Sequence, residues 1–126
     1  MRKPVYTCDY GCPVEATVDV LGGKWKAVIL YYLFRGPKRF NELRRLLPDV
    51  TQRMLTLQLR ELELDGIVHR EIFKQIPPRV EYSLTEFGVS LGPIIVQMRD
   101  WGEAYMEQIQ ARKRQRMSEV TASAQP

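Results

Sequence analysis

The clearest candidates for chemistry in this 126-residue chain are the basic side chains between positions 35 and 60. That stretch holds seven Lys and Arg residues against two acidic ones, an excess of five, whereas the whole chain has a net charge of +4. Guanidinium and ammonium groups bind phosphate, and arginine can also donate two hydrogen bonds to the edge of guanine. The concentration of positive charge therefore favours a nucleic-acid partner.

Two cysteines, Cys8 and Cys12, are the other reactive candidates. Pro13 suits the first position of a helix, which puts Cys12 in the capping position before it. A helix N-terminus favours the reactive thiolate, and the carboxylate of Glu15 in the same turn opposes that effect. The two thiols could sense oxidants, form an intramolecular or intersubunit disulfide, bind a metal, or be ordinary buried side chains.

The same residues do not predict an enzyme, a metal site or a cofactor. The C-x3-C spacing supplies two metal ligands, and the single histidine, His69, falls far away in a predicted strand. No nucleophile motif surrounds this histidine, and the sequence has no Gly-rich phosphate loop. A thiol oxidoreductase using Cys8 and Cys12 stays open as an alternative, although the usual redox spacing is C-x-x-C.

Composition indicates one soluble, cytoplasmic domain. The chain is 44% hydrophobic and 27% charged, which is ordinary for a globular protein with a single core. It has no signal-like N-terminal run and no stretch near the roughly 18 apolar residues of a membrane span. We expect an N-terminal arm over residues 1–11, one domain over 12–111 and a disordered basic and polar tail over 112–126.

Hydrophobic spacing predicts two helices at the start of the domain. The first opens at Pro13 and ends at Gly22-Gly23, and the second runs from about Lys24 to Phe34 before Gly36-Pro37. The second helix has a predicted buried stripe of Trp25, Val28, Ile29 and Tyr32.

A pair of short helices follows. After an extended piece at 38–40, Asn41 is expected to cap a helix that reaches Leu47, and Thr51 to cap a helix that ends at Gly66. The core stripe of this last helix is Leu55, Leu59 and Leu62, while Arg53, Thr56 and Arg60 point away from it. Two short helices joined by a brief turn, the second with exposed basic side chains, are typical of a helix-turn-helix.

Two β-rich runs, 67–76 and 79–84, then meet at Pro77-Pro78. The alternation of Val80, Tyr82 and Leu84 predicts a half-buried strand. A hairpin with Lys74 and Arg79 near its tip, directly after the helix pair, is typical of a wing.

Thr85 is expected to cap a long C-terminal helix that Gly92-Pro93 kinks or divides. An apolar row persists along it, spaced for packing on another helix: Leu91, Ile94, Met98, Trp101, Tyr105 and Ile109. With Val14 and Val18 of the first helix, the row from Leu91 to Tyr105 is the predicted homodimer interface. The basic run at 112–116 has two interpretations, a DNA contact or a solvated helix end.

A recognition helix enters the major groove N-terminus first. We therefore expect Arg53 to read guanine and Gln52 to read adenine, with Arg60 nearer the backbone and Arg79 in a narrow minor groove. The full predicted DNA-binding set is Lys38, Arg39, Asn41, Arg44, Arg45, Thr51, Gln52, Arg53, Thr56, Arg60, Lys74 and Arg79.

The ordered motifs of the chain resemble one family closely. They are CPVE at 12–15, LGGKW at 21–25, GPKRFNEL at 36–43, MLT at 54–56, LRELE at 59–63, DGIV at 65–68, YSLT at 82–85 and Gly88. In this order and spacing they look like an HxlR-type regulator over about Cys12 to Tyr105.

This resemblance implies a mainly α fold with a small β-hairpin wing (α+β), a winged helix-turn-helix with N- and C-terminal dimerisation helices. It implies a homodimeric transcriptional regulator whose fourth helix reads the major groove of double-stranded operator DNA. Some members sense oxidants or electrophilic compounds through a cysteine at the position of Cys12. The alternatives are the thiol-redox enzyme and a protein- or RNA-interaction module on the same fold.

Overall fold

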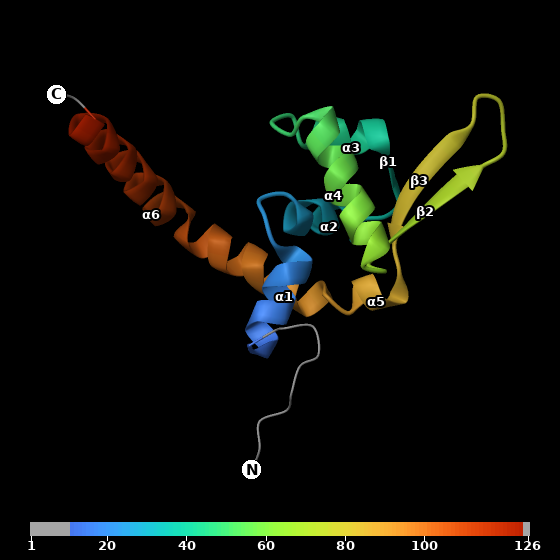
Figure 1. Ribbon diagram of the computed structural model, residues 1–126, viewed down its shortest axis with the longest axis horizontal. Coiled ribbons are helices and arrows are strands. Elements are labelled where there is room, and N and C mark those ends of the chain that lie inside the picture. The colour runs from blue at the N-terminus through green and yellow to red at the C-terminus, as the bar shows by residue number, and fades with distance from the viewer. Residues whose placement is uncertain (1–10, 125–126) are drawn as a thin grey trace, which may run out of the picture. The chain divides into compact units, whose positions relative to one another are not determined.

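The computed structural model describes residues 11–124, and the chain divides into two units. The first unit ends at Gly92 and the second is Pro93–Pro126. The elements of the first unit are α1 (Pro13–Leu21), α2 (Lys26–Leu33), β1 (Lys38–Arg39), α3 (Phe40–Leu46), α4 (Gln52–Leu64), β2 (Val68–Phe73), β3 (Arg79–Leu84) and α5 (Glu86–Val89). The helix α6 (Gly92–Ala124) begins at the boundary. The mainly helical architecture with a small sheet is confirmed (Figure 1).

Two threonine caps predicted from the sequence are confirmed. The Oγ1 of Thr51 accepts a hydrogen bond from the backbone N–H of Met54 at 3.0 Å, and that of Thr85 accepts from Gly88 at 2.9 Å. The Thr85 hydroxyl also donates to the carbonyl of Gly66 at 2.6 Å. Gly66 has the positive φ expected of a helix C-terminal cap, 74°. Thr85 thus joins the start of α5 to the end of α4.

The predicted cap at Asn41 was wrong. α3 begins one residue earlier, at Phe40, so Asn41 lies inside the helix. The Glu42 carboxylate accepts a hydrogen bond from the backbone N–H of Arg39 at 3.0 Å and satisfies the helix start instead. A glutamate at the third helical position was the signal for this alternative.

The core of the first unit lies between α2, α3, α4 and the sheet. The stripe predicted on α4 is confirmed, since Leu55, Leu59 and Leu62 are buried. On α2 the prediction held only for Ile29, because the other buried apolar residues are Leu30 and Leu33 while Trp25, Val28 and Tyr32 are half-buried. This helix is apolar almost all round, so its spacing does not select one face.

Within residues 11–124 the strands form a three-stranded antiparallel sheet in the order β1-β3-β2. Lys38 of β1 pairs with Tyr82, and the β2–β3 hairpin runs from Val68 opposite Leu84 outward to its tip. All of β3 is half-buried, as expected of a central strand, rather than alternating between faces. The extended piece before α3 therefore anchors the base of the hairpin, which projects from the helices in Figure 1.

The predicted break of the C-terminal helix is confirmed. α5 ends at Val89 and α6 starts at Gly92, with Pro93 in its first turn, where a missing N–H is tolerated. α6 continues to Ala124, so residues 112–124 are helical and differ from the disordered tail expected there. Arg, Lys, Gln, Met and Ala in this stretch all favour helix, which its polar composition obscured. Within the described residues no helix is both long and apolar enough to cross a bilayer.

Candidate nucleic-acid interface

α3 and α4 form the helix pair expected of a helix-turn-helix, and α4 has two contrasting faces. Its inner face holds α4 in the core of the first unit through the leucine stripe. Its outer face forms a shallow hollow lined by Gln52, Arg53, Thr56, Leu57 and Arg60. The structure thus brings together most of the side chains predicted to read bases, beginning in the first turn of α4.

The hydrogen bonds of α4 leave its two arginines available. Thr51 serves as the cap, and the Thr56 hydroxyl donates to the carbonyl of Gln52 at 2.8 Å. Within residues 11–124, neither Arg53 nor Arg60 forms an ion pair, and both are exposed. Two unneutralised guanidinium groups on one helix face are suited to a polyanion with hydrogen-bond acceptors.

The segment before α4 supplies further cations. Arg39, Arg44 and Arg45 are exposed, as is Asn41. Lys38 is half-buried, and its Nζ lies 3.4 Å from the carbonyl of Gly36. These side chains lie on β1 and α3, outside the outer face of α4, and are the ones predicted to contact phosphates.

The wing differs from the expectation at Arg79. The guanidinium carbon of Arg79 lies 4.2 Å from the ring centroid of Phe73, and its Nε lies 3.4 Å from Oε1 of Glu81. The side chain therefore lies against its own hairpin instead of projecting. Lys74 is exposed beside the tip and forms no ion pair within the described part of the chain. Cross-strand partners of this kind depend on register, which the sequence did not reveal.

An ion pair that the sequence pattern does not reveal joins α4 to α2. The Nζ of Lys26 lies 2.6 Å from Oε2 of Glu61, and their side chains are 9% and 41% exposed. The ammonium group is nearly buried, so the carboxylate compensates much of its desolvation. A lysine at the start of the otherwise apolar α2 was the available signal. This pair helps to orient the helix that carries the candidate DNA-reading residues.

We expect Glu61→Gln to lower the free energy of unfolding by about 1–2 kcal/mol, because the buried ammonium of Lys26 loses its charged partner. Solvent screening at the half-exposed Glu61 keeps the loss below that of a fully buried pair. The measurement is urea unfolding. Glu63→Gln is the control, because its pair with Arg70 is longer, 3.5 Å. Equal, negligible losses in both variants would contradict the role of the Lys26–Glu61 pair.

Cys12 is exposed at the start of α1 and makes no side-chain capping hydrogen bond. The Glu15 carboxylate turns back to the same helix end and accepts a hydrogen bond from the backbone N–H of Gly11 at 2.7 Å. Cys8 and nearly all of the arm expected over 1–11 lie outside the described residues. Within residues 11–124 no cluster of three His, Cys, Asp or Glu side chains could hold a metal, and His69 is exposed on β2.

The residues predicted to form the dimer interface are exposed apolar side chains in a single copy, apart from Leu91, which is half-buried. On α1, Val14 and Val18 are 70% and 59% exposed. On α6, the exposed members of the row are Ile94, Met98, Trp101 and Tyr105. Leu57 and Leu64 of α4 are exposed apolar side chains as well.

Comparison with known proteins gives consistent matches. A family model described as HxlR-like helix-turn-helix matches residues 20–110. YdeP of Bacillus subtilis, described as an uncharacterized HTH-type transcriptional regulator, is 66% identical over 99 residues, which cover 79% of this chain and 77% of YdeP. YybR of the same organism, described in the same words, is 63% identical over 103 residues, 82% of each chain.

Solved structures of transcriptional regulators also match most of the chain. The redox regulator HypR in its reduced form has a TM-score of 0.75 and 61% identity, covering 79% of this chain and 99% of that one. Its oxidized form has a TM-score of 0.72 and 67% identity, covering 74% and 96%. The reduced regulator YodB from B. subtilis has a TM-score of 0.67 and 36% identity, covering 79% and 98%.

Proposed function

The chain belongs to the HxlR-like helix-turn-helix family of transcriptional regulators, and on that premise we propose how it binds DNA. It binds a specific operator in double-stranded DNA as a homodimer, and oxidation at Cys12 changes that binding. The observation that carries the proposal is the outer face of α4. There Gln52, Arg53, Thr56 and Arg60 are exposed together, on a helix whose opposite face is buried in the core.

The outer face of α4 determines how the helix would contact the major groove. The major groove is about 12 Å wide and admits a helix. With the start of α4 inserted, Arg53 donates to O6 and N7 of a guanine, and Gln52 pairs with N6 and N7 of an adenine. Phosphate contacts from β1 and α3, and from Lys74 on the wing, set the register without reading sequence. Arg79 contributes only if it leaves Phe73 and Glu81.

Two copies are needed because one recognition helix gives too small an interface for tight, specific binding. Half-sites about 34–36 Å apart, read by two α4 helices, are the usual solution. The exposed apolar side chains of α1 and α6 support these helices as the dimer surface. The site of action is the cytoplasm, where bacterial chromosomal DNA lies.

The redox part of the proposal rests on Cys12. HypR is described as a redox regulator in oxidized and reduced forms, and YodB in reduced and diamide-treated forms. Cys12 is exposed at the start of α1, the helix that also carries Val14 and Val18 of the proposed dimer surface. When two thiols form a disulfide they give two electrons and two protons to the oxidant. A bond or adduct at this position would shift α1 and with it the spacing of the two α4 helices.

The proposal is tested by selecting genomic fragments with the purified protein under reducing and oxidising conditions. We expect enrichment of fragments that share a two-fold symmetric site, and an affinity for that site that falls steeply with salt, because phosphate contacts release counterions. Absence of duplex binding at low ionic strength would contradict the proposed function. A preference for single-stranded RNA would favour the RNA-interaction alternative instead.

Cys12→Ser should abolish the response of operator binding to oxidants while leaving reduced-state affinity within about twofold. The serine hydroxyl keeps the size of the thiol but cannot form a thiolate or a disulfide. The measurement is a mobility-shift titration before and after treatment with diamide, with a non-reducing gel to detect crosslinked dimers. Cys8→Ser is measured in parallel: a retained response assigns the reaction to Cys12 alone or to a bond between two subunits, and a lost response indicates a disulfide between Cys8 and Cys12. A full response in Cys12→Ser would reject Cys12 as the sensor.

A further inference from the structure

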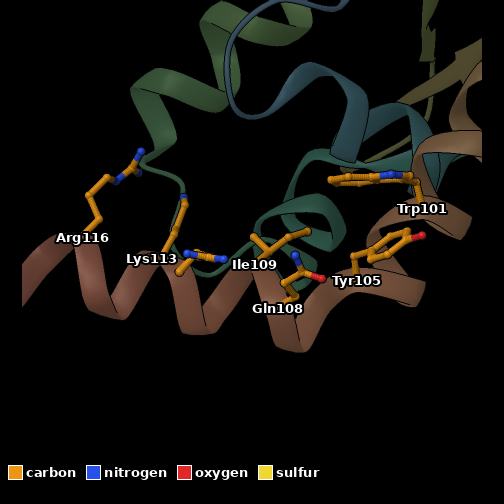
Figure 2. A pocket seen from close by; sticks show the side chains of 7 residues that line it. Trp101, Tyr105, Gln108, Ile109, Lys113 and Arg116 are labelled. Carbon is orange, nitrogen blue, oxygen red and sulfur yellow. The ribbon is translucent and has the colours of Figure 1, made fainter.

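Beyond Ile109, one face of α6 changes from apolar to cationic. A shallow hollow along α6 is lined by Trp101, Tyr105, Gln108, Ile109, Arg112, Lys113 and Arg116. Figure 2 shows the labelled side chains along one side of the helix, from the aromatic pair to Arg116. The rings of Trp101 and Tyr105 lie 5.3 Å apart, centroid to centroid, at the apolar end. We call Arg112, Lys113 and Arg116 the cationic stripe.

The cationic stripe carries an excess of positive charge. All three side chains are exposed, and within residues 11–124 none of them forms an ion pair. At 100° per residue, the acidic residues 100, 103 and 107 fall on the opposite side of α6. Glu119 falls beside the stripe, and its Oε1 accepts a hydrogen bond from Nε2 of Gln115 at 3.5 Å. Arg112 and Arg116, one turn apart, repel each other and weaken the helix. Such a surface is stabilised by an anionic partner.

We propose that the cationic stripe is a second DNA-binding surface, which holds phosphates of the duplex outside the operator half-sites. This inference rests on the proposed function, because it extends the contact made by α4. The stripe lies beyond residue 110, where the match to the family model ends, so it adds to the part of the chain that the family shares. It makes no base contacts and adds affinity without sequence preference.

The charge of the stripe favours this occupant over a second copy of the chain. A second copy of α6 that packs through the same face as the predicted dimer row would bring its own cations or its apolar row to the stripe. Either would leave the ammonium and guanidinium groups of the stripe desolvated and without an anionic partner, which raises the free energy of the complex. A phosphate backbone neutralises each of them.

The test compares a duplex trimmed to the selected operator with the same operator carrying about ten extra base pairs on each side. The test variant is the full chain with Arg112→Gln, Lys113→Gln and Arg116→Gln, changes that keep helix propensity nearly constant. Arg114→Gln and Arg116→Gln form a matched pair of single variants, because position 114 faces away from the stripe. Circular dichroism and sedimentation verify helicity and dimerisation.

For the wild type we expect at least about tenfold tighter binding to the flanked duplex than to the trimmed one. The triple variant should lose this gain, keep the trimmed-duplex affinity and show a shallower salt dependence. The slope should fall by up to about 5, since six phosphate contacts per dimer each contribute about 0.9. Arg116→Gln should reproduce part of the loss, and Arg114→Gln none of it.

Other outcomes would overturn the inference. The inference fails if the wild type binds the flanked duplex no more tightly than the trimmed one. It also fails if the triple variant still binds the flanked duplex more tightly. Both results leave the proposed function intact. A triple variant that no longer dimerises would assign the stripe to the subunit interface. A variant that loses binding to RNA but not to flanked DNA would assign it to RNA. If the wild type binds no duplex, the proposed function fails as well.

Discussion

Replacing Arg53 with alanine should relax the sequence preference of the protein while its fold and dimer stay intact. Arg53 lies in the first turn of α4, is exposed, and lines the same hollow as Gln52 and Thr56. A bidentate contact to guanine is worth about 1–3 kcal/mol of discrimination, so one base pair of each half-site should lose about 5- to 150-fold of its preference. The side chain contributes nothing to the core, so stability should change little.

The measurement is a titration of operators that each carry one base-pair substitution. Arg60→Ala is the control, since Arg60 lies on the same face two turns later, where a phosphate contact is expected. It should weaken binding to all operators alike and reduce the salt slope. Arg53→Lys should lose most of the discrimination as well, because an ammonium group is a point charge. An unchanged preference profile in Arg53→Ala would defeat the assignment.

The helix that carries the candidate interface could be predicted because its signals are local. Thr51 caps the helix that follows it, and the leucines of α4 recur with helical spacing, so both the boundary and the outward face of α4 follow from adjacent residues. The same logic failed on α2, whose apolar residues surround the helix and leave the buried face to tertiary packing. The spacing of apolar residues identifies the buried face of a helix only where polar residues occupy the opposite face.

The contacts that the sequence did not predict join residues from different elements of the fold. Lys26 and Glu61 are 35 positions apart and meet only when α2 packs on α4. Arg79 is withdrawn toward Phe73 by the cross-strand register of the hairpin. The helix over residues 112–124 is a different case, because its propensity was visible but its polar composition suggested a tail. The sequence therefore indicated the elements that carry the candidate interface, but not the contacts that depend on packing and register.

The largest effect should come from Trp101→Glu, which we expect to abolish the dimer and with it tight operator binding. Trp101 is 61% exposed in one copy and lies at the centre of the predicted row on α6. Aromatic side chains at the centre of an interface commonly contribute at least about 2 kcal/mol, and a carboxylate in their place adds an unpaired, desolvated charge. Together these terms should weaken dimerisation by about a thousandfold or more.

Sedimentation and operator titration should change together, because a monomer carries one α4 and can occupy only one half-site at a time. Met117→Glu is the matched control: Met117 is 68% exposed on the same helix but lies outside the row, so this variant should stay dimeric. Trp101→Phe, which keeps an aromatic anchor, should restore much of the association. A Trp101→Glu protein that remains dimeric would move the interface away from α6, and operator binding by a proven monomer would remove the need for a dimer altogether.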